Sequence, residues 1–282
     1  MKRTFAFCGA ATALVVAAVI LVSQPVGVWA DEALLIHAHA HNDYEHPRPL
    51  LDALEQGFHS VESDVWLDEG EIMVAHDRPD SLEGYKGSLV ELYLDPLQAR
   101  VDEKGSVYGD DEPLYLWIDI KDSRPVIMPV LHSTLENYSM LSRYSDEEID
   151  QRPVTVILTG DHERKQGMTD RYEYRPYCRD SNSFREDDPM ADHRWRWYAL
   201  NWNSYFDWRG DEPMPPETRE ELTSLVYQIH AKGRKVRFYA TPETPLYWQA
   251  ALDAQVDLIN TDLLVDLHLF LTQEASTGEV EP

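Results

Sequence analysis

Residues 60–67 read SVESDVWL and residues 114–121 read LYLWIDIK, and these two stretches decide the fold class. Both set carboxylates among large apolar and β-branched residues, which predicts buried strands with acidic groups on one face. Six further stretches also favour strands, namely residues 33–41, 154–160, about 172–178, 196–203, 235–241 and 257–262. The sequence therefore predicts eight strands.

Amphipathic stretches separate these strands. The clearest is residues 216–232, whose apolar residues recur at helical spacing before Gly233, a residue that favours a left-handed helix cap. Further expected elements are helices at residues 49–56, 89–101, 126–141 and 246–254, a short strand at 71–77, and long loops at 161–194. Strands that alternate with helices indicate βα units on a parallel sheet, and eight such units usually take about 250 residues. We therefore expect an α/β fold, a single (β/α)₈ TIM barrel.

The first thirty residues predict export. Two basic residues precede a nearly continuous apolar run at residues 5–22, and small residues at 28 and 30 flank a tryptophan where a signal peptidase would cleave. We expect residues 1–30 to be a signal peptide, residues 31–272 the barrel domain and residues 273–282 a flexible tail, with the protein periplasmic or secreted. The alternative is an uncleaved membrane anchor, because the apolar run approaches the length of a spanning helix.

The chain is strongly acidic, with a formal net charge of −26. Such a surface repels phosphate backbones and anionic membranes, so no binding of nucleic acid is expected. Of the two cysteines, Cys8 lies in the apolar run, so Cys178 is left without a disulfide partner once that segment is removed. The sequence implies no stable protein partner.

Acidic residues on two of the expected strands indicate a metal site. Glu62 and Asp64 flank Ser63 and face the same side of their strand, where two like charges need a compensating cation. Carboxylate oxygens are the ligands that Mg²⁺ and Ca²⁺ prefer, so one such ion is expected, with Asp119 as the third ligand. Lys121 lies two residues beyond Asp119 on the same face and is a candidate cation for a phosphate. The alternatives are a surface ion pair for the first two carboxylates and a salt bridge between Asp119 and Lys121.

Histidines supply candidate acid–base groups. His37, His39 and His41 alternate along the first expected strand, and His41 is the best placed because catalytic groups lie at the carboxyl ends of barrel strands. His37 is expected to lie deeper and to be structural, and His39 is undecided. His76, before Asp77, supplies a second imidazole. Histidines packed in the barrel interior are the alternative for each of the first three.

The motifs form an ordered set: HNDY, ALEQGFHSVESDVW, EIMVAHD, LYLWIDIK and, near the end, KVRFYATPETPLYWQAALDAQVDLINTD. This set resembles the superfamily of glycerophosphodiester phosphodiesterases and phosphatidylinositol-specific phospholipases C, in particular the branch similar to the yeast "altered inheritance of mitochondria" protein 6. The resemblance implies that His41 and His76 are the general acid–base pair. It also implies that Glu62, Asp64 and Asp119 hold the metal and that Lys121 contacts the phosphate.

Two departures leave the substrate open. Glycerophosphodiesterases typically have Arg-Gly after the first histidine, where this chain has Asn42-Asp43, and Tyr44-Glu45-His46 stands in place of their Glu-Asn-Thr. The carboxylate set is more similar to that of the spider-venom sphingomyelinase D relatives.

The function expected is metal-dependent hydrolysis of a glycerophosphodiester or phospholipid-type substrate by two histidines, with a small phosphodiester or lipid headgroup as the ligand. Candidate substrate contacts are Asn42 and, in the aromatic stretch at residues 195–208, Trp202, Asn203 and Trp208, for which core packing is the alternative. Two other functions stay open: an exported, non-catalytic barrel that binds a glycan or lipid headgroup, and a transition-metal hydrolase that uses the histidine run.

Overall fold

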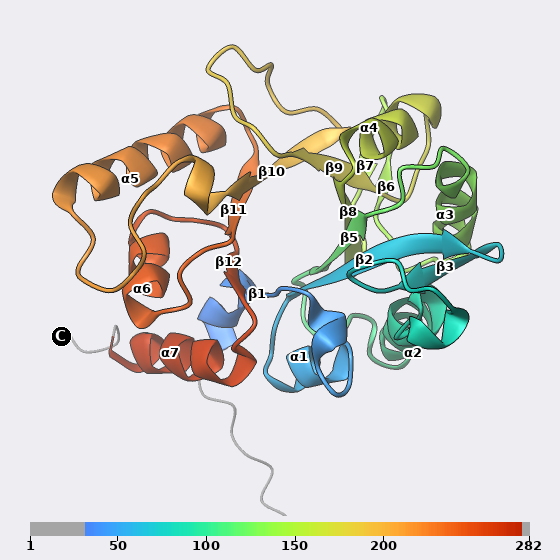
Figure 1. Ribbon diagram of the computed structural model, residues 1–282, viewed down its shortest axis with the longest axis horizontal. Coiled ribbons are helices and arrows are strands. Elements are labelled where there is room, and N and C mark those ends of the chain that lie inside the picture. The colour runs from blue at the N-terminus through green and yellow to red at the C-terminus, as the bar shows by residue number, and fades with distance from the viewer. Residues whose placement is uncertain (1–31, 278–282) are drawn as a thin grey trace, which may run out of the picture. The chain divides into compact units, whose positions relative to one another are not determined.

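The central sheet consists mainly of eight parallel strands. The computed structural model describes residues 32–277, with side chains for residues 35–273, so the expected signal peptide lies outside the described residues. The parallel strands are β1 (Ala38–Ala40), β2 (Ser60–Asp68), β5 (Leu114–Ile120), β8 (Val154–Gly160), β9 (Cys178–Ser181), β10 (Trp195–Asn201), β11 (Lys235–Tyr239) and β12 (Ile259–Thr261). They pair in the order β11-β10-β9-β8-β5-β2-β1-β12 (Figure 1). A single parallel bridge between Arg237 and Leu258 joins the two ends of this order.

Short antiparallel strands extend the sheet on one side. β3 (Glu71–Val74) pairs with the second half of β2, and β4 (Gly87–Ser88) pairs with β3. A separate two-stranded sheet contains β6 (Arg143–Tyr144) and β7 (Ile149–Asp150). The short strand expected at residues 71–77 is therefore confirmed for residues 71–74.

Helices connect most successive strands and lie around the outside of the curved sheet (Figure 1). They are α1 (Leu51–Glu55), α2 (Asp95–Lys104), α3 (Ile127–Glu136), α4 (His162–Arg171), α5 (Pro216–Ala231), α6 (Pro245–Asp253) and α7 (Leu264–Thr277), with a π-helical turn (Val90–Leu94) before α2. Short 3₁₀ turns cover Glu32–His37, Asp43–Glu45, Leu82–Gly84 and Trp202–Ser204. The chain is thus a single α/β domain, and none of its described helices is long and apolar enough to cross a bilayer.

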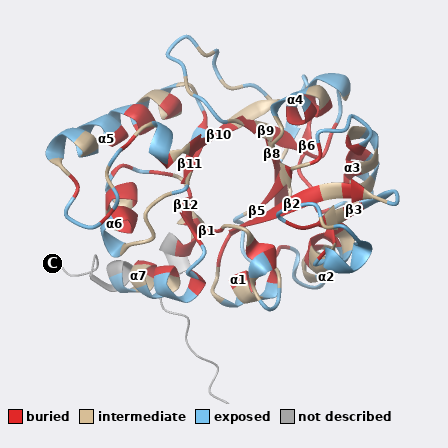
Figure 2. Ribbon diagram, in the orientation of Figure 1, coloured by how far each residue is buried: buried red, intermediate tan, exposed pale blue. Residues whose placement is uncertain are grey.

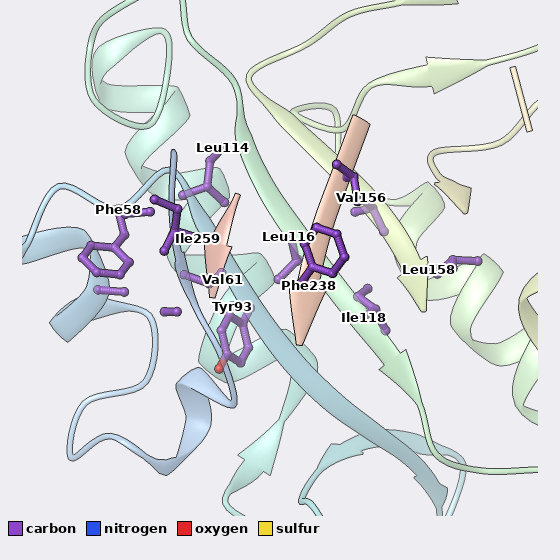
Figure 3. Close-up of a cluster of buried hydrophobic side chains, with 14 of the residues drawn as sticks. Phe58, Val61, Tyr93, Leu114, Leu116, Ile118, Val156, Leu158, Phe238 and Ile259 are labelled. Carbon is purple, nitrogen blue, oxygen red and sulfur yellow. The ribbon is translucent and has the colours of Figure 1, made fainter. Parts of the chain in front are cut away.

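The strands place alternate side chains in two different environments. On β5, Leu114, Leu116 and Ile118 belong to the main cluster of buried hydrophobic side chains, part of which Figure 3 shows, whereas Trp117 belongs to a second cluster. Asp119 follows on the same face as Trp117, because side chains along a strand alternate with period two. Figure 2 shows that the strands are largely buried, so polar side chains on the inner face are held in a desolvated interior.

The structure corrects the first expected strand. Residues 33–37, expected to start it, form a 3₁₀ turn, and only Ala38–Ala40 pair with β2 and β12. His37 is therefore not on the strand, and its Nδ1 atom lies 2.9 Å from the carbonyl oxygen of Asp257. Strand pairing, rather than the apolar pattern of residues 33–36, sets where β1 begins.

The region expected to be loops contains a helix. α4 begins after Asp161, whose carboxylate accepts a hydrogen bond of 2.9 Å from the backbone N–H of Arg164, a typical N-cap. The fifth strand, β9, lies at Cys178–Ser181 rather than at 172–178. At the end of the chain α7 continues to Thr277, so residues 273–277 of the expected tail are helical, and residues 278–282 lie outside the described part. In α4 the polar residues concealed the helical period, because its buried face includes Lys165 and Thr169.

Candidate active site

Three carboxylates converge near the carboxyl ends of β2 and β5. Asp64 is the register partner of Asp119 on the neighbouring strand, and Glu62 lies two residues before Asp64 on the same face. One oxygen of each of the three lies within 4.8 Å of the others, and within the described residues this is the one group of at least three His, Cys, Asp or Glu side chains able to hold a metal ion. The expected convergence of Glu62, Asp64 and Asp119 is confirmed.

Gly160, at the end of β8, makes room for one of these carboxylates. A Cβ atom at this position would overlap the Oδ1 atom of Asp119, and the residue has a φ of +81° that side chains rarely adopt. The Oδ1 atom of Asp119 is buried and has no hydrogen-bond partner, and the same holds for Oδ1 of Asp64. Buried oxygens of this kind are normally satisfied, so these two are open to a ligand.

Burial governs the charge of two of the carboxyl groups. It raises the pKa of Asp64 to about 7, and the neighbouring charges of Asp119 and Glu62 act in the same direction. Burial also raises the pKa of Asp119, although Lys121 opposes the effect. A divalent cation at this point would favour the ionised form of both groups.

Lys121 lies between two of the carboxylates. Its Nζ atom is 2.8 Å from Oδ2 of Asp119 and 3.1 Å from Oδ2 of Asp64. Burial would lower the pKa of Lys121, but the charges of Asp119 and Asp64 raise it above its usual value, so the side chain is a cation. The salt bridge considered as an alternative for Lys121 is therefore present in this structure, and it holds the ammonium at the edge of the carboxylate group.

Glu62 is held by a residue that the sequence did not single out, Arg237 of β11. The two guanidinium nitrogens donate to Glu62 at 2.6 Å and 3.2 Å, and one of them also donates to Asn260 at 2.7 Å. Burial opposes the ionisation of Glu62, yet Arg237 and the hydrogen bond with His39 hold its pKa well below the usual range. Glu62 is an anion in this arrangement.

His39 belongs to the same buried network. Its Nδ1 atom lies 2.7 Å from the hydroxyl of Ser60, and its Nε2 atom lies 3.4 Å from Glu62 and 3.1 Å from Arg237. Burial, together with the charge of Arg237, lowers its pKa to about 4. His39 is therefore neutral at physiological pH and supports Glu62.

His41 lies at the rim, next to the carboxylates. Its Nδ1 atom is 2.8 Å from Oδ1 of Asp262, just beyond β12, and its Nε2 atom is 4.0 Å from Glu62. Burial would lower the pKa of His41, but the hydrogen bond with Asp262 and the charge of Glu62 outweigh it and raise the pKa above its ordinary value. The Asp262 contact also orients the ring, because it occupies Nδ1 and leaves Nε2 toward the carboxylates.

The residue after His41 turns the chain sharply. Asn42 has a left-handed conformation with φ 44°, which asparagine adopts more readily than most residues, and its Oδ1 atom accepts a hydrogen bond of 3.1 Å from Tyr44. The following Asp43 is buried and accepts hydrogen bonds from Tyr93 and from the backbone N–H of Leu50. The HNDY motif therefore fixes the rim loop as well as placing a histidine.

A cavity of about 350 Å³ brings most of the expected site residues together. His41, Asn42, Glu62, His76, Asp119 and Lys121 all line it, and so do Thr159, Gly160, Asn182, Arg237 and Tyr239. His76 contributes from the end of the β3 hairpin, and 57% of its side chain is exposed. The imidazoles of His41 and His76 thus share one cavity with Glu62 and Asp119, whereas Asp64 is fully buried and does not line it.

The expected aromatic contacts lie elsewhere. Trp202 is fully buried in the core outside the sheet, where its ring contacts Phe206 and Tyr247, and neither it nor Asn203 nor Trp208 lines the cavity. The Nε1 atom of Trp208 donates to the carbonyl of Glu212. The structure does not place these three residues at the cavity, because the strand β10 ends at Asn201 and a 3₁₀ turn, Trp202–Ser204, follows it.

The histidine run does not form a metal site of its own. His37 bonds a backbone carbonyl and His39 is enclosed by Ser60, Glu62 and Arg237. Within the described residues, no histidine belongs to a group able to hold a metal.

Comparison with known proteins agrees with this arrangement. Residues 29–180 match the AIM6-like phosphodiesterase domain. Altered inheritance of mitochondria protein 6 from Saccharomyces cerevisiae is 31% identical over 267 residues, which cover 80% of this chain and 68% of that protein. The protein of the same name from Lachancea thermotolerans is 26% identical over 274 residues, or 81% of this chain and 64% of that one. A third protein of this name, from Eremothecium gossypii, is 33% identical over 153 residues, which cover 47% of this chain and 39% of that protein.

The chain spans between 39% and 68% of the length of these relatives. The family match covers β1 to β9, and so includes every carboxylate of the acidic group and both rim histidines. With this match over more than half of the sequence, and with the yeast relative aligned over most of it, the chain belongs to the family of AIM6-like phosphodiesterase domains.

Proposed function

We propose that this protein is an exported (β/α)₈ barrel that hydrolyses phosphodiesters with the help of one divalent cation, Mg²⁺ or Ca²⁺. The barrel is supported by the eight parallel strands and by the bridge between Arg237 and Leu258 at the two ends of their order. The export part rests on residues 1–30 of the sequence alone. The single observation that carries the activity is the convergence of three carboxylates, two of which, Glu62 and Asp119, line a cavity that two histidines share.

The residues of the acidic group fit a hard cation. Oδ1 of Asp64 and Oδ1 of Asp119 are buried without partners, and Glu62 is ionised, so the group offers three oxygen ligands of the kind that Mg²⁺ and Ca²⁺ prefer. When bound, the cation would neutralise negative charge on the phosphate. Arg237 limits the freedom of Glu62, so Asp64 and Asp119 are the freer ligands.

The histidines supply the proton transfers. One imidazole accepts the proton of the attacking hydroxyl as the new P–O bond forms, and the other gives a proton to the leaving oxygen as the old P–O bond breaks. The attacking group is water or, if a cyclic phosphate forms, a hydroxyl of the substrate. His41 is oriented for this by Asp262, whereas His76 is more exposed and follows the strand β3.

Cationic side chains complete the cavity. Lys121 stands at its edge and can contact a nonbridging phosphate oxygen, which stabilises the charge that develops during the reaction. The volume of about 350 Å³ suits a small headgroup, so we propose a glycerophosphodiester or phospholipid-type substrate. Trp202 and Trp208 play no part in this proposal, because they do not line the cavity.

The test is turnover of a panel of glycerophosphodiesters, lysophospholipids, inositol phospholipids and an activated bis-aryl phosphodiester, each with EDTA and with added Mg²⁺ or Ca²⁺. His41→Ala and His76→Ala should each lose at least about 10²-fold in kcat, the low end for a general acid or base. His162→Ala, an exposed histidine on α4, is the matched control and should keep the wild-type rate.

Asp119→Asn should behave differently from the histidine variants. It keeps the shape of the side chain but weakens the cation site. Higher metal concentrations should therefore restore part of the activity of Asp119→Asn, whereas they should restore none of the activity of His41→Ala. If the wild-type protein cleaves no member of the panel with any divalent metal, the proposed hydrolysis is refuted, and the non-catalytic binding barrel takes its place. Dependence on bound zinc or iron, undiminished in Asp119→Asn, would point instead to the transition-metal hydrolase.

A further inference from the structure

A second cavity, of about 420 Å³, lies at the amino-terminal end of the strands. Tyr115 and Thr155 line it from the second residues of β5 and β8, and Lys235 lines it from the first residue of β11. The active-site cavity is lined from the other ends of the same strands, by Asp119 and Tyr239 among others. The two cavities share no lining residue, so the second one is a separate site.

The charges that face this cavity are mainly positive. Arg196, Arg234 and Lys235 line it together with one carboxylate, Asp257. The Oδ2 atom of that carboxylate is occupied, because His230 Nε2 lies 2.8 Å from it and the backbone N–H of Val236 donates to it at 2.8 Å. In a chain with a net charge of −26, this is a locally basic environment.

The two arginines at this cavity differ in their hydrogen-bond partners. Arg234 is buried and donates to the carbonyls of Trp195, Pro189 and Met190, so its role is structural. Arg196 is half-buried, and among the described residues its side chain has neither a hydrogen-bond partner nor an ion pair. A guanidinium has five N–H donors, and an anion in the cavity can accept two of them in a bidentate pair.

Aromatic rings hold the other cation in place. The Nζ atom of Lys235 lies 2.9 Å from the hydroxyl of Tyr115, and 5.1 Å and 5.4 Å from the ring centres of Tyr115 and Trp197. These contacts fix the ammonium at the cavity wall without neutralising its charge, since none of them is with an anion. The rings of Tyr144 and Trp197 add apolar surface.

We propose that this cavity binds a small organic anion, one that carries a phosphate or carboxylate group on a compact, ring-sized body. Arg196 and Lys235 contact the charged group, and Trp197 and Tyr144 pack against the body. The site is independent of the acidic group at the other end of the strands and requires no divalent metal.

The experiment is calorimetric titration of the full chain, in EDTA and at low salt, with phenyl phosphate, benzoate and inorganic phosphate in separate arms. Wild type should bind one equivalent of phenyl phosphate or benzoate more tightly than inorganic phosphate, because only the first two bury a ring. Arg196→Gln and Lys235→Gln should each weaken binding by about tenfold or more, the effect of losing one charge-assisted hydrogen bond. Arg196→Lys, which keeps the charge, should lose less than Arg196→Gln.

Two further variants show whether the anion binds in this cavity or elsewhere on the chain. Arg219→Gln removes an arginine from the outer surface of α5 and should leave the affinity unchanged, as should Lys121→Gln at the active-site cavity. Circular dichroism of each variant shows whether it is folded, and Arg196→Lys remains informative if Arg196→Gln is not. Loss of binding in Lys121→Gln with normal binding in Arg196→Gln and Lys235→Gln would overturn the proposal, because the anion would then be at the active site. So would an absence of binding up to about 10 mM of either ring-bearing probe.

Discussion

Replacement of Arg237 by methionine should strongly destabilise the protein. Arg237 is almost fully buried, donates to both oxygens of Glu62 at 2.6 Å and 3.2 Å, and stacks on the ring of Trp117 at 4.2 Å. Methionine keeps part of the apolar stem but leaves Glu62 ionised, buried and without its main partner. Breaking a buried ion pair from one side costs about 3–5 kcal/mol, a large part of the free energy of unfolding of a typical domain.

The pH dependence distinguishes this cause from a simple loss of packing. In wild type the pKa of Glu62 is depressed, so its contribution to stability is present above its ordinary pKa and is lost only as the pH falls below it. Without Arg237, burial should instead raise this pKa. A raised carboxyl pKa means that stability is lost as the pH rises, so the deficit of Arg237→Met should be larger at pH 8 than at pH 5.

The assay is urea unfolding in EDTA at both pH values for wild type, Arg237→Met, Glu62→Gln and the double variant. The double variant should be more stable than the sum of the two single losses predicts, because neither charge is then left unpaired. Arg219→Met is the matched control: its guanidinium pairs with Asp253 at 2.9 Å on the surface, where such pairs contribute about 0–1 kcal/mol. The reasoning is refuted if Arg237→Met costs no more than this control, or if its deficit is the same at pH 5 and pH 8.

Three further predictions test the surroundings of the site. Gly160→Ala should lower the free energy of unfolding by about 1–3 kcal/mol and displace Asp119, because the new methyl group overlaps that carboxylate and φ is positive. Calorimetric titration should show weaker binding of Mg²⁺ or Ca²⁺. Unchanged metal affinity would contradict the prediction. Asp262→Asn should lower the pKa of His41, since burial remains while the charge of the partner is lost. NMR titration of the imidazole measures this pKa. A value equal to that of wild type would show that the contact with Asp262 does not raise the pKa of His41. Burial raises the pKa of Asp43 to about 7, so the wild-type protein should lose stability as the pH rises from about 4 to 7. In chemical unfolding, Asp43→Asn should reduce the dependence of the free energy of unfolding on pH in this range. An unaltered dependence would show that another group causes it.

The carboxylates of the site were predictable from the sequence because their arrangement is local. Glu62 and Asp64 face the same side since a strand repeats with period two, and Asp119 lies on the same kind of strand among the same kind of apolar residues. The convergence follows once β2 and β5 are neighbours. His41 was found by its position at the carboxyl end of the first strand, whereas the role of His76 came from the resemblance to a known family.

Residues that act over long sequence distances were not predictable in this way. Arg237 reaches Glu62 across 175 positions and Asp262 reaches His41 across 221, and no local pattern marks either one as a partner. A hint existed for Arg237, an arginine between the apolar residues Val236 and Phe238, whose buried charge needs a partner. The sequence also did not show whether Trp202 faces the cavity or the core, because a run of aromatic residues has the same local pattern in both places.

By itself the sequence determined most of the parallel strands, their inner and outer faces and the chemistry of the groups on them, because these depend on contacts within a few residues. The tertiary structure alone decided that Arg237 neutralises Glu62, that Asp262 orients His41, that residues 33–37 leave the sheet, and that Arg196 faces a second cavity. These outcomes depend on which strands become neighbours and on how the chain turns at their ends. That pairing is set by the packing of the whole core, and no short stretch of sequence contains it.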